Sequence, residues 1–226
     1  MAGIVTIVQA RAGSSRLPSK FAKPIAGRPM LAHVLERAMA IGYPVWLATS
    51  DTERDDPVAD IATQMGIPVY RGIEWDVLGR MAACARAANA GIVVRVTGDC
   101  PCLCVDTARE VIALYTRQLG IVTNDTTTSG WPDGLDVEVF PVTGLYEAER
   151  VTTDRADREH CTPWLRRTLP HTVFECAENW SRVKLSVDEQ ADLERVRAIM
   201  GYLPTGDYTW PALRRALLAW QAKGAA

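Results

Sequence analysis

Short β-branched runs alternate along the chain with segments whose apolar residues recur every three or four positions. Strands are predicted at residues 4–8, 45–48, 68–70 and 92–96, and helices at 30–41, 57–65, 77–90 and 106–119. Strands that alternate with helices of this length favour right-handed βαβ units. The sequence therefore predicts an α/β protein built on a mainly parallel sheet.

The pattern becomes less regular after residue 120. We expect a polar loop at 123–134, strands at 135–140, 172–176 and 183–187, and helices at 143–150, 157–169, 191–200 and 210–220. No repeat, low-complexity tract or flexible linker interrupts the 226 residues, and 48% of them are apolar. This length and this apolar content fit one domain with a sizeable core, so we predict a single domain over residues 1–226.

The charges nearly cancel, with 25 basic residues against 27 acidic ones. Proteins that bind nucleic acid non-specifically usually carry a basic excess, so no nucleic-acid partner is predicted. No apolar run is long enough to span a bilayer, and residues 1–9 lack the basic start of a signal peptide. We therefore expect a cytoplasmic protein with no membrane partner.

Three of the six cysteines lie together in the segment CPCLC at residues 100–104. Their spacing lacks the paired C-x-x-C arrangement of structural zinc sites. Free thiols in a reducing compartment pack as small hydrophobic side chains. We expect that role for these cysteines rather than a metal site.

A loop rich in cations follows the first predicted strand. Residues 9–20 read QARAGSSRLPSK and place Arg11, Arg16 and Lys20 within ten residues. Gly13 allows a tight turn, and Ser14 offers N–H and O–H donors. Ligands of open α/β sheets bind at the carboxyl ends of strands, so this loop is a candidate triphosphate site. It differs from a Walker A loop in spacing, and the alternative is a solvated basic loop.

Two later strands are each followed by an aspartate. The segment RVTGDCP at 95–101 places Asp99 after one strand, and LSVDEQAD at 185–192 places Asp188 after another. Carboxylates at a sheet edge suit Mg²⁺, which takes few protein ligands besides phosphate oxygens and water. Each aspartate could equally cap a turn or a helix. A magnesium site is predicted only if Asp99 and Asp188 meet in space.

These segments and several others occur in an order that resembles a known family, the cytidylyltransferases. This family includes CMP-KDO synthetase, CMP-sialic acid synthetase and the spore-coat polysaccharide biosynthesis protein F type, which is the most similar. The resemblance covers about residues 5–197 and rests on motifs together with their order. Besides the three segments above, the motifs are TSD at 49–51, DVLGR at 76–80, PDGLDVEVF at 132–140 and REHCTP at 158–163.

The resemblance implies a nucleotidyltransferase of the GT-A-like fold, with a mostly parallel mixed sheet and helices on both faces. It implies transfer of CMP from CTP to a small acidic acceptor, a sugar acid or a phosphonate, with release of pyrophosphate. It also implies Mg²⁺ as cofactor, a role in surface polysaccharide or glycoconjugate biosynthesis, and a homodimer.

The resemblance also implies roles for individual residues. Those near the nucleotide would be Ala10, Arg11, Gly13, Ser14, Arg16, Lys20, Arg71 and Asp76. The metal ligands would be Asp99 and Asp188, which with Arg11 and Lys20 form the catalytic set. The acceptor side would contain Asp133, Glu138, Arg158 and His160, with His160 either a general base or a structural residue.

Two other functions remain open at this point. A glycosyltransferase of the same fold would use a nucleotide-sugar and usually carries an Asp-x-Asp motif, whereas this strand ends in Gly98-Asp99-Cys100. A catalytically silent nucleotide-binding protein would bind CTP without turnover. Departures from the family pattern, such as Ser19 in place of glycine before Lys20, remove no charged ligand but leave the acceptor open.

Overall fold

The computed structural model describes residues 3–13, 16–124 and 126–224. The strands are β1 (Gly3–Gln9), β2 (Pro24–Ile25), β3 (Arg28–Pro29), β4 (Val45–Ser50), β5 (Val69–Gly72), β6 (Ala90–Thr97), β7 (Ile121–Thr123), β8 (Val137–Pro141) and β9 (His171–Val173). The α-helices are α1 (Met30–Ile41), α2 (Asp56–Gln64), α3 (Val77–Ala87), α4 (Val105–Tyr115), α5 (Thr126–Ser129), α6 (Val142–Val151), α7 (Arg155–His160), α8 (Pro163–Thr168), α9 (Gln190–Met200) and α10 (Trp210–Gly224). Two 3-10 turns, η1 (Lys20–Ala22) and η2 (Glu53–Asp55), precede α1 and α2.

Seven strands form one sheet in the order β5-β4-β1-β6-β8-β7-β9. The strands β5, β4, β1 and β6 are parallel to one another, β8 runs antiparallel to both of its neighbours, and β9 is parallel to β7. The predicted fold class, a mostly parallel mixed sheet, is therefore confirmed, and β8 is the reversed strand. Strands β2 and β3 form a separate hairpin.

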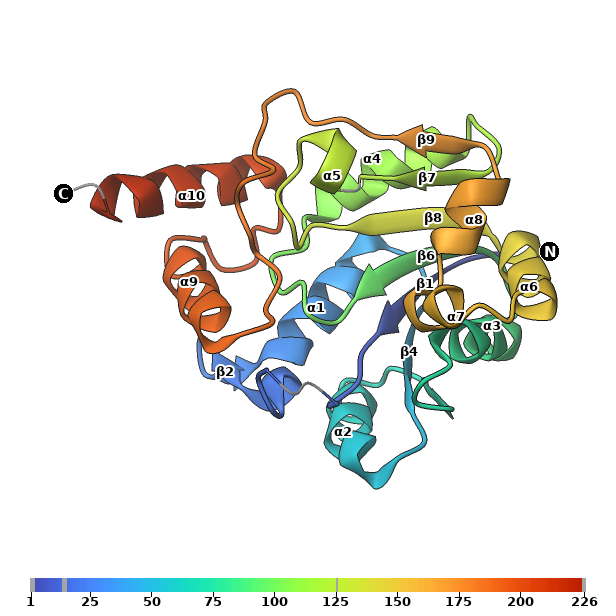
Figure 1. Cartoon of the computed structure of the whole chain (residues 1–226). Helices are drawn as coiled ribbons and strands as arrows, with labels where there is room; N and C mark the ends of the chain where they lie inside the picture. Colours follow the sequence, from blue (N-terminus) through green and yellow to red (C-terminus); the bar gives the residue numbers. More distant parts are fainter. Residues whose placement is uncertain (1–2, 14–15, 125, 225–226) are drawn as a thin grey trace.

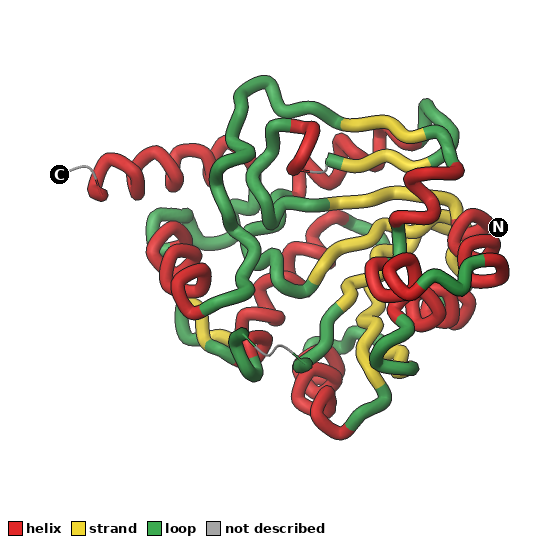
Figure 2. Tube along the Cα trace, viewed as in Figure 1, coloured by secondary structure: helices red, strands yellow, loops and turns green. Residues whose placement is uncertain are grey.

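Helices cover both faces of the sheet, as Figure 1 shows. The β-branched residues of β1 alternate between the two faces because successive side chains of a strand point to opposite sides. Val8 packs in a core cluster with residues of α1, α4, α9 and α10, and Ile7 packs in a second cluster with residues of α3, α6 and α8. In Figure 2 several loop segments lie between the sheet and α9. No helix within the described residues is long and apolar enough to cross a membrane.

The structure corrects three details of the predicted elements. The helix expected at 157–169 is two helices, α7 and α8, separated at Cys161, whose φ is 70°. Pro163 explains this break, because it has no N–H and its ring would clash with a carbonyl one turn earlier. The strand expected at 183–187 contains only an isolated bridge between Asp133 and Lys184. The loop expected at 123–134 includes the short helix α5.

Candidate active site

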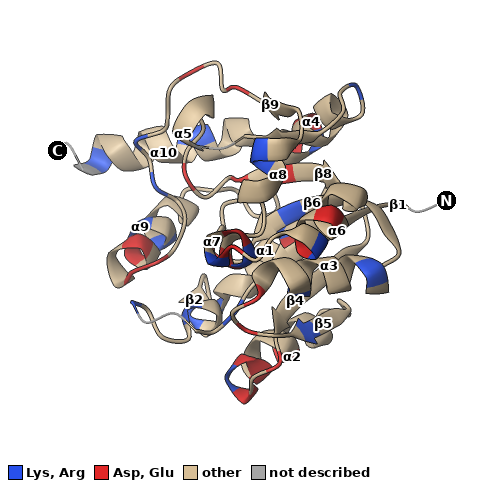
Figure 3. Cartoon of the chain, turned by 45° about the vertical axis from the view of Figure 1, so that its right-hand side comes forward, with Lys and Arg blue, Asp and Glu red and all other residues tan. Residues whose placement is uncertain are grey.

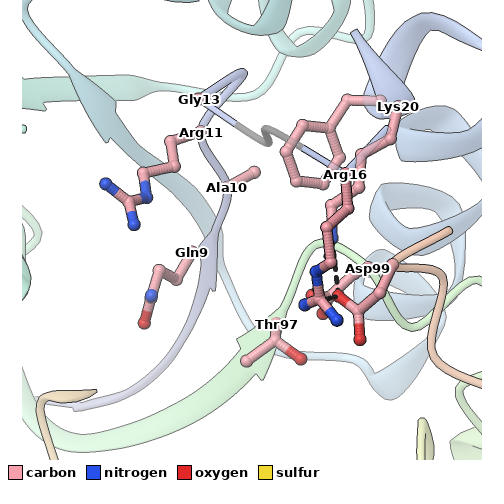
Figure 4. Close-up of a pocket in the computed structure, with 10 residues that line it drawn as sticks. Gln9, Ala10, Arg11, Gly13, Arg16, Lys20, Thr97 and Asp99 are labelled. Atoms are coloured by element: carbon pink, nitrogen blue, oxygen red, sulfur yellow. Dashed lines mark hydrogen bonds and ion pairs between the residues drawn. The ribbon is translucent and has the colours of Figure 1, made fainter. Parts of the chain in front are cut away.

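A pocket of about 270 Å³ lies at the carboxyl ends of β1 and β6. Both strands contribute to its lining, together with the cation-rich loop that follows β1 and one residue from the segment before α9 (Figure 4). The lining residues are Gln9, Ala10, Arg11, Gly13, Arg16, Lys20, Phe21, Thr97, Asp99 and Asp188. Ser14, which we also expected near the nucleotide, lies outside the described residues.

Lys20 brings the two aspartates together at this pocket. Its side chain is 8% exposed, and Nζ lies 3.1 Å from Oδ2 of Asp99 and 3.4 Å from Oδ1 of Asp188. Nζ also donates a 2.8 Å hydrogen bond to the carbonyl of Val187. Figure 4 shows Arg16 and Lys20 extending toward Asp99. The proximity that a magnesium site requires of Asp99 and Asp188 is therefore present.

Backbone hydrogen bonds hold the segment before Asp188 against two loops that are distant in the sequence. The N–H of Leu185 donates to the carbonyl of Asp133, and the N–H of Val187 donates to the carbonyl of Asp99, at 2.7 and 2.9 Å. Such bonds fix both the direction and the register of an extended chain. They place Asp188 directly beside the end of β6.

The approach of β6 to β1 at the pocket depends on Gly98. Its N–H donates a 2.8 Å hydrogen bond to the carbonyl of Gln9. A Cβ atom at this position would lie 2.6 Å from the Cβ of Ala10 and 3.1 Å from the ring of Phe21. Because real Cβ contacts are longer than 2.6 Å, a larger residue would push the loop of Asp99 away from β1.

Asp188 has two basic neighbours in addition to Lys20. Its Oδ2 accepts a 3.1 Å hydrogen bond from Lys184, and Arg16 lies 3.3 Å from its Oδ1. Burial alone would raise the pKa of Asp188, but the hydrogen bond from Lys184 and the charge of Lys20 lower it below its usual value. Asp188 is therefore held as a carboxylate.

Asp133 behaves in the opposite way, although it lies in the same group of acidic residues. It accepts a 2.7 Å hydrogen bond from Ser186. Burial raises its pKa, and the negative charges of Asp99 and Asp188 contribute to the rise. Asp133 does not line the pocket, but its raised pKa beside two carboxylates makes it a candidate proton acceptor.

Arg11 lies on the opposite side of the pocket from Asp99. Figure 4 shows Arg11 and Gln9 pointing away from the pair formed by Lys20 and Asp99. The Arg11 guanidinium is 3.9 Å from Glu74 and 3.8 Å from Glu159, and its side chain is 36% exposed. These separations are too long for hydrogen bonds, so with respect to the described residues the guanidinium has donors left for an anionic ligand.

Three further residues expected at the site are engaged in contacts that connect elements. Arg71 pairs with Asp56 at 2.6 Å and donates to the backbone carbonyls of Ser50 and Thr52. Asp76 caps α3 and pairs with Arg158 through two hydrogen bonds of 2.9 and 2.5 Å. Arg71, Asp76 and Arg158 do not line the pocket described above. His160 is exposed at the last position of α7.

Glu138 is buried, with 3% of its surface exposed. One carboxylate oxygen accepts hydrogen bonds from Arg95 and Thr162, and the other accepts two from Arg166 at 2.9 and 2.7 Å. Figure 3 shows basic segments of β6 and α8 close to an acidic segment of β8. Burial alone would raise the pKa of Glu138, but the two arginines hold it below its usual value.

The chain resembles known proteins in sequence and in fold. A family model described as cytidylyltransferase matches residues 5–198. The chain belongs to the cytidylyltransferase family. The resemblance inferred from the motifs is thus confirmed over most of the chain.

Curated relatives of this cytidylyltransferase carry several names. The spore coat polysaccharide biosynthesis protein SpsF of Bacillus subtilis is 28% identical over 88% of this chain and 87% of its own length. An uncharacterized protein of Methanocaldococcus jannaschii, MJ1063, is 30% identical over 72% of this chain, a match that spans 66% of that protein. The 3-deoxy-manno-octulosonate cytidylyltransferase of Xanthomonas campestris is 38% identical over 42% of this chain and 39% of its own length.

Solved structures place the cytidylyltransferase in the same fold. A cytidylyltransferase from Leptospira borgpetersenii superposes with a TM-score of 0.93 at 24% identity, covering 98% of this chain and 96% of that one. A CMP:2-keto-3-deoxy-manno-octonic acid synthetase complexed with CTP superposes with a TM-score of 0.69 at 19% identity, covering 88% and 99%. At these identities the likeness concerns the fold.

The cytidylyltransferase site also contains residues to which the sequence analysis assigned no role. Gln9, Phe21 and Thr97 line the pocket, and Arg95 connects Gln9 to Glu138. The sequence could have indicated a buried ion pair at Arg95, since a single cation in a buried β-branched strand requires a buried partner. The sequence does not indicate which acidic residue that partner is, because this depends on the order of the strands.

The carboxylates of the pocket suit a hard cation with few protein ligands. Asp99 and Asp188 direct oxygen atoms toward one cationic group, the Lys20 ammonium. Among the described residues, no group of three or more histidine, cysteine or acidic side chains could hold a metal ion by itself. Mg²⁺ is commonly bound by one or two carboxylates and completed by phosphate oxygens and water. The two aspartates fit such an ion in the presence of a nucleotide.

Proposed function

We propose that this cytidylyltransferase transfers CMP from CTP to a sugar acid, or to a phosphonate, with release of pyrophosphate. The observation that supports this most is the convergence of Lys20 on Asp99 and Asp188 beneath a loop that carries Arg11 and Arg16. Three cations around one pocket match the charge of a triphosphate. The name of one relative, the spore coat polysaccharide biosynthesis protein SpsF, favours a role in surface polysaccharide biosynthesis.

The proposed reaction is an in-line displacement at the α-phosphorus. An acceptor oxygen forms a bond to that phosphorus, while the bond to the bridging oxygen breaks and pyrophosphate leaves. Arg11, Arg16 and Lys20 would bind the phosphates and stabilise the charge that develops on the leaving group. Asp133, with its raised pKa, would accept the proton that the acceptor hydroxyl loses.

Mg²⁺ is part of this proposal, with Asp99 and Asp188 as its protein ligands. When bound, it would neutralise phosphate charge and lower the pKa of the acceptor hydroxyl. Lys20 would then move from the two carboxylates to the phosphates, because its ammonium group and the metal ion would repel each other at the same position.

We also propose that the enzyme works in the cytoplasm as a homodimer. All six cysteines are free thiols, and five of them are buried, which suits a reducing compartment. Light scattering coupled to size-exclusion chromatography would test the dimer, and a mass of about 25 kDa, that of the 24.8 kDa chain, would contradict it.

The reaction is tested by measuring pyrophosphate release with Mg²⁺ and with CTP, UTP, ATP or GTP, against a panel of sugar acids and phosphonates. Asp99→Asn removes a pocket carboxylate, and Asp60→Asn removes an exposed carboxylate on α2 as a matched control. We expect release with CTP and one acceptor, lost in Asp99→Asn and kept in Asp60→Asn. Absence of release with every pair, together with binding of a nucleotide-sugar, would favour the glycosyltransferase instead.

A further inference from the structure

The side chain of Gln9 is held in one orientation at the edge of the pocket. Gln9 ends β1, and its Oε1 accepts two hydrogen bonds from Arg95, from Nε at 3.1 Å and from Nη2 at 3.0 Å. Because a guanidinium only donates hydrogen bonds, the carboxamide atom that faces Arg95 must be the oxygen. These bonds therefore fix the orientation of the Gln9 amide. The Nε2 group is then the end left to interact with a ligand, and it makes no hydrogen bond to any described residue.

Arg95 is in turn fixed by Glu138. The two residues face each other in the register of β6 and β8, and the Arg95 Nη1 pairs with Oε2 of Glu138. The exposed fractions of their side chains are 13% and 4%. All three nitrogens of Arg95 are thus used, one for Glu138 and two for Gln9.

Glu138 has no capacity left for a substrate. Thr162 donates to Oε2, and Arg166 donates twice to Oε1. A buried ion pair contributes little net stability compared with apolar side chains of similar size, because desolvation opposes the attraction. A chain of buried pairs that ends on a pocket residue therefore suggests that the orientation of Gln9 matters.

We propose that Gln9 donates a hydrogen bond from Nε2 to an oxygen of the acceptor, and that Arg95 and Glu138 are positioning residues for this donor. The inference rests on the proposed function, since it names an acceptor contact in the same pocket. The pocket already has three cations for phosphate groups, and a neutral amide adds little to charge neutralisation. A fixed amide suits recognition of a hydroxyl or carboxylate oxygen, because a substrate that lacks this oxygen leaves the donor unpaired.

The chain allows a variant that removes only the donor. Gln9→Glu keeps an oxygen for Arg95 and has nearly the same shape, but it has no N–H group. We expect kcat/KM for the acceptor to fall roughly ten- to a hundredfold, with KM for CTP and the melting temperature almost unchanged. Glu138→Gln should also weaken acceptor use, because Arg95 loses its charged partner. Glu149→Gln breaks an exposed ion pair with Arg86 and serves as the control.

A spectroscopic measurement separates this inference from the proposed reaction. The Gln9 side-chain amide signals in a ¹⁵N–¹H spectrum can be assigned by their loss in Gln9→Glu. We expect a sugar acid or phosphonate of the panel to shift these signals in the presence of Mg²⁺ and CMP, and CTP alone to leave them in place. Signals that no panel compound shifts, or that CTP alone shifts, would overturn the inference even if pyrophosphate release is normal. Normal acceptor kinetics in Gln9→Glu would overturn it as well.

Discussion

At the scale of single residues, the site depends on how Lys20 divides its contacts. Its ammonium group touches two carboxylates and one carbonyl that come from segments distant in the sequence. A lysine provides one compact charge with three donors, which matches three separate acceptors. The same group can serve the phosphates of CTP once the carboxylates have another cation.

Removing the charge of Lys20 should therefore affect the reaction more than removing another charge of the same loop. We expect Lys20→Met to lower kcat/KM for CTP by roughly 10²–10³, the scale of one lost electrostatic contact in a transition state. Lys23 does not line the pocket, so Lys23→Met is the matched control. Steady-state kinetics with thermal unfolding as a folding check would measure this. Equal effects of the two substitutions would contradict the assignment.

Asp192 lies beside Asp188 and contributes to the stability of the folded protein through its ionised carboxylate. Burial opposes its ionisation, but hydrogen bonds from Lys184, from the N–H groups of Asp188 and Glu189, and from Arg195 lower its pKa to about 2. Because the pKa is lower in the folded state, this contribution to stability is present above about pH 4 and disappears as the pH falls toward 2. Asp192→Asn should reduce the free energy of unfolding by about 1–2 kcal/mol at pH 7.

Urea unfolding between pH 3 and pH 7 tests this expectation. The difference between the wild type and Asp192→Asn should shrink as the pH falls. Glu194→Gln, an exposed carboxylate on the same helix, should show almost no difference at any pH. A difference that stays constant down to pH 3 would argue against the lowered pKa.

At the scale of the elements, local pattern predicted most of the first half of the chain. The helix expected at 30–41 is α1, and the run 4–8 lies within β1. These elements follow from periodicity, which residues close in sequence determine. The hairpin of β2 and β3 was missed because strands of two residues have no periodicity. Pro163 indicated the break between α7 and α8, but the helical pattern led to the prediction of one continuous helix.

One close approach between loops should be sensitive to a single methyl group. Gly134 has a φ of 96°, and a Cβ there would lie 2.3 Å from the backbone N of Ser186. Gly66 has a φ of 73° with open space around it. Gly66→Ala should cost about 1 kcal/mol, from backbone strain alone. Gly134→Ala should cost more than about 2 kcal/mol, because crowding adds to the strain.

Chemical unfolding would compare the two glycine variants. We also expect Gly134→Ala to weaken catalysis, since it would shift the segment that leads to Asp188. The same loss of stability in both variants would show that the approach of these loops is not tight.

At the scale of the whole molecule, pairing between distant segments was the part that sequence could not supply. The motifs indicated Asp99 and Asp188 separately, but their meeting depends on the segment before α9 pairing with the loops after β6 and α5. The partnership of Arg95 and Glu138 depends on β8 lying next to β6 in reverse direction. Both facts follow from pairing between segments distant in the sequence, which no local pattern encodes.

The last helix, α10, contributes one apolar face to the core. The apolar face of α10 packs on the fold, with Leu213 and Leu217 almost fully buried, while Leu218 is 43% exposed. Leu217→Ala should reduce the free energy of unfolding by about 2–5 kcal/mol because it leaves a cavity. Leu218→Ala should change it by less than about 0.5 kcal/mol. Urea unfolding measures both, and a large effect of Leu218→Ala would instead place that face in an interface.

We propose that the pocket at the carboxyl ends of β1 and β6 transfers CMP from CTP to the acceptor. The most direct test follows the label of [α-³²P]CTP into product, with the acceptor identified by pyrophosphate release, in the wild type, Asp99→Asn and Asp188→Asn. We expect the label to enter a CMP-linked product with the wild type and to stay in CTP with both variants. Label that stays in CTP with the wild type, or enters the product equally well with either variant, would show that this pocket does not carry out the transfer.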